Sequence, residues 1–495
     1  MNKSRLVVVF SLLVIASMAL ASCAPAAPQV VTQVVVQTAA PVIQTQVVVQ
    51  TAAPVVQTQV VKETQVVQVT AAPAAQAKPV VTWTQYDQGN VDPKSDERVG
   101  NDYMRKYIPI FNQAFAGKWY WDNQFSPWDR VRGKIVAAVQ AKADVPDVVQ
   151  VGSFDLTTFA SNGTFQDLTD WAKAQKWYAE MDQSAIDSCT VGGKLLCIPV
   201  STQFYMVYAW KDMYPNGWPK TPDDWLAEGA RLQKEGKYAM TFFGSTAFSG
   251  EGAVRAVFMT FSSFGGGYDD GKGHLTLNTP ENVAAVTWLR EMVQKKYVPE
   301  IAFAGNFQEE EAFKDASAGA LPTGFFGYRY LNPLTAPNGN KYNKGNENDF
   351  LDAVAAGDAV LEPFVAPEGK KPSGGIATSD FAIPVGAKNL DGAHDFLNWL
   401  MTAEQDANFS IGPGGGLPTI KSAQANPAFQ TAFYKEAADV SAVSEYKTIF
   451  PSISDTATAE KLIMDAVYNL IKKTPTADIA KTLQAAQDEY NKNVP

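Results

Sequence analysis

Short apolar runs alternate along this chain with segments whose apolar residues recur every three or four positions. Residues 80–83 and 148–151 are apolar runs of strand length, whereas residues 103–115 and 131–143 carry the helical spacing. Pro146 and Asp147 end the second helical pattern. This succession of strands and helices predicts an α/β fold with a largely parallel sheet.

Further helical patterns follow in the rest of the chain. They lie at residues 221–234, 279–295, 391–401 and 456–472, and another helical stretch begins near Asp170. Thr221 is suited to cap its helix and Pro222 to occupy the first helical position. A chain of 495 residues is too long for one hydrophobic core, so we expect two or more domains.

The N-terminus has the pattern of an export signal. Lys3 and Arg5 precede an apolar stretch at residues 6–19 that is too short to span a bilayer comfortably. The sequence LASC follows directly and resembles the lipobox of bacterial lipoproteins, in which the cysteine is lipidated and becomes the first mature residue. We therefore expect a signal peptide at residues 1–22 and a lipidated Cys23 carrying more than one acyl chain. The alternative is an ordinary cleaved signal with an accidental cysteine.

Two cysteines remain once Cys23 is set aside. Cys189 and Cys197 form an even pair in an exported, oxidising setting. If residues 192–194 form a three-residue hairpin loop, the two cysteines lie directly opposite each other, close enough for a disulfide. We predict this bridge; the alternative is two reduced, buried thiols.

A low-complexity segment separates Cys23 from the first predicted strand. Residues 24–79 are almost all Ala, Pro, Val, Gln and Thr, and residues 33–45 are repeated nearly unchanged at 46–58. A repeat so poor in large side chains cannot build a core, and its prolines interrupt any long strand. We interpret residues 23–79 as an extended tether; a short β-solenoid is the rival interpretation.

The amino-acid composition argues against several classes of function. The net charge is −10, and no basic stripe is present to neutralise nucleic-acid phosphates. The chain has only two histidines, which nearly removes His-ligated metals and Ser-His or Cys-His catalysis from consideration. We expect no catalytic residues, no metal site and no cofactor. Aromatic residues make up 11% of the chain and can supply rings to a cleft for a polar ligand.

Seven motifs follow one another along the chain. They are VPDVV (145–149), GTFQDLT (163–169), GKLLCIP (193–199), YAWKDMY (208–214), PKTPDDW (219–225), AHDFLNWLMTAEQ (393–405) and GGLPT (415–419). In this order they resemble the extracellular solute-binding proteins of the family that includes the maltose-binding proteins. Each motif is weak alone, and their order across residues 80–495 carries the resemblance. It implies the two-lobed periplasmic-binding-protein fold of type II, whose lobes close on a ligand by hinge motion.

The resemblance also implies domain boundaries. The crossovers between lobes fall near residues 200–203, 374–378 and 417–419. The N-terminal lobe would then comprise residues 80–202 and 376–417, and the C-terminal lobe residues 203–375 and 418–495.

Ligand-binding side chains of an open α/β sheet lie beyond the carboxyl ends of its strands. In the first lobe this rule selects residues that follow two predicted strands: Gln85, Tyr86, Asp87, Ser153, Phe154 and Asp155. Trp83 ends the first strand, either in the core or facing the ligand. In the second lobe Phe243, with Ser245 after it, ends another likely strand.

The resemblance adds further candidates. Asp155 matches a loop that supplies a sugar-binding carboxylate in maltose-binding proteins, although the arginine that follows there is Leu156 here. Gln203 matches an acidic ligand contact, and Phe326, two residues before Tyr328, replaces a stacking tryptophan. Phe325 would then belong to the core. Gly415 and Gly416 lie in a glycine run that can bring backbone N–H groups to a ligand.

We therefore expect a lipid-anchored receptor, placed at the cell surface or in the periplasm, that binds a mono- or oligosaccharide and delivers it to an ABC importer permease. We expect a monomer. A receptor of the same fold for a polyol phosphate or a polyamine, and a surface lectin or sensor without transport, remain alternatives. A glycosidase would need two facing carboxylates. The three glutamates at residues 309–311 favour a solvated helix start instead.

Overall fold

The computed structural model describes residues 76–89, 98–246, 251–344 and 348–494. The predicted signal peptide, Cys23 and the predicted tether up to residue 75 lie outside the described residues. None of the described helices combines the length and the apolar composition that a membrane-spanning helix requires.

The first strands form a parallel sheet, as predicted. β1 (Lys78–Thr84) lies between β2 (Trp119–Phe125) and β3 (Val148–Gly152), with Trp83 beside Gln124. β1 begins two residues before the predicted start at residue 80. Every residue of β3 is buried, which explains why its sequence is nearly continuously apolar rather than alternating.

The rest of the sheet contradicts the predicted parallel arrangement. β6 (Ile198–Trp210) pairs antiparallel with β11 (Ser373–Ala382), and β11 pairs antiparallel with β3. β7 (Ala320–Gly324) and β10 (Ala359–Glu362) also pair antiparallel with β6. The main order is β10-β6-β11-β3-β1-β2. Among these further strands of the described residues, only β13 (Glu445–Thr448) pairs parallel, with β11. The prediction failed because β6 pairs with strands more than 100 residues away, and the local succession of strands and helices does not report the direction of such distant partners.

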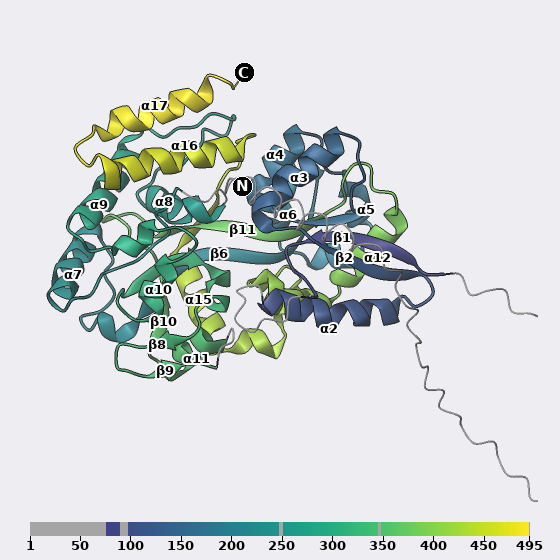
Figure 1. Ribbon diagram of the computed structural model, residues 1–495, viewed down its shortest axis with the longest axis horizontal. Coiled ribbons are helices and arrows are strands. Elements are labelled where there is room, and N and C mark those ends of the chain that lie inside the picture. Colours follow the sequence, from purple (N-terminus) through teal and green to yellow (C-terminus); the bar gives the residue numbers. More distant parts are fainter. Residues whose placement is uncertain (1–75, 90–97, 247–250, 345–347, 495) are drawn as a thin grey trace, which may run out of the picture. The chain divides into compact units, whose positions relative to one another are not determined.

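The long strands β6 and β11 connect two groups of elements. In Figure 1 they run side by side between the helices around α3 (Trp128–Gln140) and the helices around α8 (Glu251–Ser263). The remaining helices are α2 (Arg98–Ala114), α4 (Leu156–Ser161), α5 (Thr169–Lys173), α6 (Gln183–Ser188), α7 (Pro222–Lys234), α9 (Pro280–Gln294), α10 (Glu309–Lys314), α11 (Asn348–Ala356), α12 (Leu390–Leu400), α13 (Ala403–Phe409), α14 (Lys421–Gln424), α15 (Ala432–Val443), α16 (Thr456–Tyr468) and α17 (Ile479–Asn491).

Short elements complete the described part. They are the strands β8 (Leu334–Thr335), β9 (Lys341–Tyr342), β12 (Leu417–Pro418) and β13 (Glu445–Thr448), and the short helical turns η1 (Ser153–Asp155), η2 (Lys176–Glu180), η3 (Lys211–Met213), η4 (Glu300–Phe303), η5 (Phe325–Arg329), η6 (Ser410–Gly414), η7 (Pro427–Gln430) and η8 (Asn469–Lys473).

Local sequence signals set several helix starts. The Thr221 hydroxyl accepts a hydrogen bond from the Asp224 N–H at 3.2 Å, and the Asp224 carboxylate accepts one from the Thr221 N–H at 2.9 Å. This reciprocal capping box, with Pro222 in the first turn, confirms the predicted start of α7. At α9, within the helical pattern predicted at residues 279–295, the Thr279 hydroxyl caps the helix by accepting from the Asn282 N–H at 3.1 Å.

The predicted disulfide between Cys189 and Cys197 is confirmed, but the predicted hairpin register is wrong. β4 (Thr190–Val191) and β5 (Lys194–Leu195) pair across a two-residue loop, so Cys189 lies opposite Leu196. The loop consists of Gly192 and Gly193, whose φ angles are 58° and 80°. Two consecutive positive φ angles favour a two-residue turn that matches the twist of the paired strands.

Aromatic side chains on β6 fill the core. Tyr205, Tyr208 and Trp210 are at most 1% exposed. The Trp210 ring stacks on Phe313 with the ring centroids 5.1 Å apart, and its indole N–H donates to the Phe313 carbonyl. β6 is therefore fixed along its length, which makes it a rigid frame for the residues around it.

Candidate functional site

The three segments predicted as crossovers lie side by side. Thr202 on β6 has Thr378 of β11 on one side and Leu417 of β12 on the other. Gly416 approaches so closely that a Cβ there would lie 2.3 Å from the carbonyl oxygen of Thr202. The backbone crossing is therefore tightly packed, and the candidate residues are arranged around it.

The residues predicted after β1 divide into two groups. The Tyr86 hydroxyl is buried and donates to the Pro413 carbonyl at 2.9 Å, and it accepts from the Gln85 amide at 2.8 Å. Asp87 is exposed, and its carboxylate accepts from the Gly89 N–H. Gln85 and Tyr86 thus lie at the crossing, whereas Asp87 lies at the surface.

The glycine run forms part of a loop that many candidates contact. The Gln203 amide donates to the Gly414 carbonyl at 2.6 Å. Gly415 has a φ of 56°, and the N–H groups of Gly415 and Gly416 both donate to the Ser410 carbonyl. In this structure the two glycines serve close backbone packing, and contact of their N–H groups with a ligand stays a prediction.

Phe326, on η5, lies beside this loop next to Gly415. It is half-buried, whereas the adjacent Phe325 is fully buried, as the sequence predicts for one core ring and one site ring. Two guanidinium groups flank Phe326: that of Arg255 lies 5.1 Å from the ring centroid and that of Arg329 lies 5.9 Å away. The ring predicted to stack on a sugar is therefore also a cation-binding ring.

Arg329 holds the glycine loop to η5. Its guanidinium donates to the carbonyls of Pro413 at 2.6 Å and Gly412 at 3.2 Å, and to the Tyr86 hydroxyl at 3.4 Å. No carboxylate forms an ion pair with Arg329 within the described ranges. Burial acts to lower the pKa of Arg329, but the phenol groups of Tyr330 and Tyr86 leave that pKa raised overall, so the side chain stays charged.

The remaining second-lobe candidates are buried behind Phe326. Tyr328 is 2% exposed and donates its hydroxyl hydrogen bond to the Ile411 carbonyl at 2.9 Å. Phe243 is buried against Phe307, with the ring centroids 5.2 Å apart, and Ser245 is also buried. Arg255 lies 5.8 Å from the Phe307 ring centroid, so these residues continue the cluster that begins at Phe326.

Asp155 lies away from the glycine loop, between α3 and α16. It is 6% exposed, and its carboxylate pairs with Arg132 of α3 and accepts from the Thr456 hydroxyl of α16 at 2.6 Å. Burial raises the pKa of Asp155, and the charge of Arg132 acts against that shift. Contact of Asp155 with a ligand stays a prediction, because one of its oxygens already has these two partners.

The two residues before Asp155 support the crossing. The Ser153 hydroxyl accepts from the Thr378 N–H at 2.9 Å. Phe154 is buried, with its ring centroid 6.1 Å from that of Trp128. Ser153 therefore orders β11, and Phe154 packs within the first lobe.

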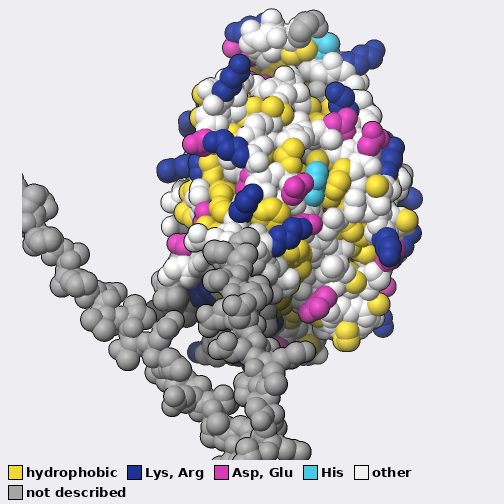
Figure 2. Space-filling model, turned by 90° about the vertical axis from the view of Figure 1, so that its right-hand side faces the viewer, with side chains coloured by type: hydrophobic (Ala, Val, Ile, Leu, Met, Phe, Trp, Pro, Cys, Tyr) yellow, Lys and Arg dark blue, Asp and Glu magenta, His cyan; other side chains and the backbone are white. Residues whose placement is uncertain are grey.

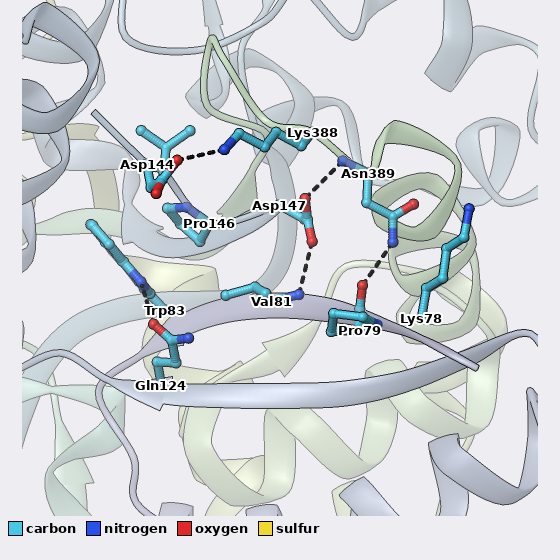
Figure 3. Close-up of a pocket in the computed structure, with 11 residues that line it drawn as sticks. Lys78, Pro79, Val81, Trp83, Gln124, Asp144, Pro146, Asp147, Lys388 and Asn389 are labelled. Carbon is cyan, nitrogen blue, oxygen red and sulfur yellow. Dashed lines mark hydrogen bonds and ion pairs between the residues drawn. The ribbon is translucent and has the colours of Figure 1, made fainter. Parts of the chain in front are cut away.

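Trp83 lies apart from the other candidates. It lines a cavity of about 470 Å³ on the first lobe, together with Lys78, Gln124, Asp144 and Lys388 among others (Figure 3). Its indole N–H donates to the Gln124 side chain at 3.1 Å, and the ammonium of Lys134 lies 3.5 Å from its ring centroid. None of the other predicted ligand residues lines this cavity.

Three arginines at the interface were not predicted as site residues. Arg132 and Arg329 come from separate segments, and Arg255 lies on α8 with its guanidinium donating to the Thr323 hydroxyl at 2.8 Å. Arg255 and Arg329 lie in otherwise apolar segments, whereas Arg132 lies among other charged residues and carries no such signal. On the face shown in Figure 2, basic and acidic side chains are interspersed.

Two buried carboxyl groups have strongly altered surroundings. Glu309 begins α10 but is 4% exposed, so the predicted solvated helix start is wrong for this residue; burial raises its pKa to about 7. Asp380 on β11 is fully buried; neither of its oxygens meets strict hydrogen-bond geometry within the described residues, and the neutral Thr378 side chain is the group that acts to stabilise its charged form. Burial raises the pKa of Asp380 well above its usual range.

Asp380 also belongs to the one group with metal-ligand spacing that the described residues contain. Its carboxylate and the sulfurs of Cys189 and Cys197 lie within 4.8 Å of one another. Both sulfurs are joined in the disulfide, so they supply no thiolate ligands. The donor set does not fit a metal ion in this form.

Comparison with known proteins agrees with this geometry. The profile of a family described as "bacterial extracellular solute-binding protein" matches residues 106–439. Three solved structures show the same fold at low sequence identity. The maltose-bound MalE3 of T. maritima has 18% identity and a TM-score of 0.66, covering 84% of this chain and 99% of that chain.

The other two structures are similar to the same extent. The GacH receptor of Streptomyces glaucescens, solved unliganded and with acarbose, has 16% identity and a TM-score of 0.67, covering 84% of this chain and 98% of that chain. The maltotriose-binding protein of Thermus thermophilus, bound with maltotriose, has 17% identity and a TM-score of 0.63, covering 84% and 100%. Because the profile matches more than half of the sequence, this chain belongs to the family of bacterial extracellular solute-binding proteins.

Proposed function

We propose that this protein is a membrane-anchored, extracytoplasmic receptor that captures a carbohydrate between two closing lobes and delivers it to an ABC importer permease. The observation that carries the proposal is the side-by-side arrangement of β6, β11 and β12 at the three predicted crossovers. In this proposal residues 80–202 and 376–417 form one lobe, and residues 203–375 and 418–495 form the other. Cys23 carries the lipid anchor.

The ligand residues we propose lie around the glycine loop. Three distant segments bring Gln85 with Tyr86, Gln203 and Phe326 together there. Tyr86 and Gln203 donate to the carbonyls of Pro413 and Gly414, Gln85 donates to Tyr86, and Phe326 lies beside Gly415. Amide and phenol groups provide paired donors and acceptors for hydroxyl groups, and a half-exposed ring provides an apolar face. The structural neighbours include receptors solved with maltose, acarbose and maltotriose, which supports a sugar as the ligand class.

A thermal-shift screen of the full chain tests the ligand class. A ligand that binds only the folded state raises the melting temperature according to its concentration relative to its dissociation constant. We expect maltose, maltotriose or a polyol to raise the melting temperature without being consumed. Cleavage of a saccharide during the assay would contradict the receptor proposal itself.

One observation favours a second ligand class. Arg255 and Arg329 both lie beside Phe326, and Arg329 has no carboxylate partner in the described part of the chain. Guanidinium groups pair well with carboxylates and phosphates. An acidic solute, such as a uronate or a polyol phosphate, therefore suits the surface formed by Phe326, Arg255 and Arg329 better than a polyamine does. Tighter binding of glucuronate than of glucose in the same screen would support this class.

Membrane attachment and transport need separate tests. We expect the full chain to fractionate with membranes and its Cys23→Ala variant to be released, because the thiol is the site of lipid attachment. Transport is tested by uptake of the identified ligand in cells with and without the neighbouring permease genes. Binding without uptake would favour the alternative of a surface lectin or sensor.

A further inference from the structure

Thr456 connects two parts of the chain that are far apart in sequence. Its hydroxyl donates to the Asp155 carboxylate at 2.6 Å and accepts from the Arg132 guanidinium at 2.9 Å. Asp155 and Thr456 are 301 positions apart. Asp155 and Arg132 also form an ion pair, so each of the three side chains contacts the other two.

Neighbouring residues repeat the connection. The Thr158 and Thr456 hydroxyl oxygens lie 3.1 Å apart, and the Thr456 N–H donates to the Thr158 hydroxyl at 3.3 Å. The Thr157 hydroxyl donates to the Ile453 carbonyl. The start of α16 is therefore held to η1 and α4 by several side-chain hydrogen bonds rather than by a backbone ladder.

The two sides of this network belong to different groups of elements. α3, η1 and α4 accompany the parallel strands β1 and β3, whereas α16 packs against α8 and α17. Figure 1 shows α16 on the same side of β6 and β11 as α3 and α4, approaching them from the other end of these strands. The contacts thus run from one proposed lobe to the other.

Because these side chains are largely buried, the loss of any one of them takes a hydrogen-bond or charge partner from the others. Arg132 pairs with Asp155 and lies 3.5 Å from the Glu460 carboxylate, while Asp155, Thr456 and Glu460 are 6%, 0% and 1% exposed. A buried charge that loses its partner is costly unless water replaces the partner. Separation of the lobes would hydrate all of these groups together, which favours two discrete arrangements over a continuum.

We infer that Asp155, Arg132 and Thr456 form an interlobe clasp that stabilises the closed state, and that they act as positioning residues without touching the ligand. The inference rests on the proposed receptor function and changes the role predicted for Asp155 from ligand contact to closure. A clasp changes the equilibrium between open and closed lobes, so its loss lowers the affinity for every ligand by the same factor. A ligand contact, in contrast, changes the affinity of different ligands by different factors.

The test compares Thr456→Val with Thr458→Val in the full chain. The first variant removes a buried hydroxyl at nearly constant volume. The second makes the same change at an exposed threonine two residues later on α16. Dissociation rates are measured by stopped flow for maltose, maltotriose, ribitol and glucuronate, together with the free energy of unfolding. Asp155→Asn is measured in the same way.

We expect Thr456→Val and Asp155→Asn to raise the dissociation rate about tenfold, as for loss of a hydrogen bond to a charged group. The factor should be equal for every ligand that binds, and Thr458→Val should leave the rate unchanged. Factors that differ more than threefold between ligands in Asp155→Asn would show direct ligand contact and overturn the clasp.

Hydrogen exchange without ligand makes the test independent of the ligand class. If none of the four compounds binds, the carbohydrate proposal fails, but the clasp is still decided by amide exchange at residues 153–158 and 453–458. We expect exchange there to be about tenfold faster in Thr456→Val than in Thr458→Val, with no change in β3 or β6. Equal exchange in the two variants would overturn the clasp.

Discussion

The two proposed lobes are joined in two physically different ways. At the crossing of β6, β11 and β12 they share backbone, with ladder pairs such as Thr202 with Thr378 and the close approach of Gly416. At the clasp they share only side-chain contacts between Asp155, Arg132 and Thr456. The backbone hydrogen bonds at the crossing can be replaced by hydrogen bonds to water only if the chain unfolds locally. The side-chain hydrogen bonds of the clasp can be replaced by water without unfolding. The crossing should therefore govern the free energy of unfolding, and the clasp the release of ligand.

Removal of the disulfide beside the crossing gives the largest expected effect. Cys189→Ser combined with Cys197→Ser should lower the free energy of unfolding by about 2–4 kcal/mol, because the unfolded chain loses a covalent constraint. Guanidinium denaturation measures this change. Ligand dissociation at 25 °C should stay within about twofold of the parent. A large acceleration of dissociation would contradict the division of roles between crossing and clasp.

Gly416→Ala tests the crossing directly. A Cβ at this position would meet the Thr202 carbonyl at 2.3 Å, so we expect a loss of about 1–3 kcal/mol of unfolding free energy from overpacking. Gly267→Ala is the matched control, because a Cβ there would have no neighbour within 4 Å. If Gly416→Ala were as stable as its control but bound ligand weakly, Gly416 would be a ligand residue, as the sequence predicts.

Asp380→Asn should stabilise the protein at neutral pH by on the order of 1 kcal/mol, because it removes the cost of a buried carboxyl group that only the neutral Thr378 side chain helps to keep charged. The pKa of Asp380 is raised in the folded state, so the folded chain holds this proton more tightly than the unfolded chain does. Wild-type stability should therefore fall as pH rises above the unfolded pKa of about 3.9.

Melting curves between pH 4 and pH 8 check this sign. The variant should melt above the wild type at pH 7 and close to it at pH 4. Asp167→Asn should behave in the opposite sense, because hydrogen bonds from Thr169 lower the pKa of Asp167. A melting temperature of Asp380→Asn below that of the wild type at pH 7 would indicate that the ionised carboxylate has a stabilising partner.

Trp83→Phe should have the smallest effect. The substitution removes the hydrogen bond from the indole N–H to Gln124, in the cavity that Trp83 lines, and should lower the free energy of unfolding by about 1 kcal/mol. Ligand affinity, measured by calorimetry, should stay within twofold because none of the other candidate residues lines that cavity. A tenfold loss of affinity would return Trp83 to the ligand site.

Local sequence signals predicted the parts of the fold that depend on neighbours in the chain. The capping box at Thr221, the buried strand β3 and the pairing of Cys189 with Cys197 are all confirmed. The hairpin register was wrong by one residue because two consecutive glycines favour a shorter turn than the one assumed. The solvated start predicted at Glu309 was wrong because a local charge pattern does not report burial by distant elements.

The sequence by itself determined the family, the order of motifs and the starts of individual helices and strands, because these depend on hydrophobic period and on local turn and cap chemistry. Only the tertiary structure decided that Asp155 meets Thr456 across 301 positions, that two arginines flank Phe326, and that Trp83 lies in a separate cavity. Such contacts follow from how the lobes pack, and a single arginine or threonine carries no local signal of the distant residue it will meet.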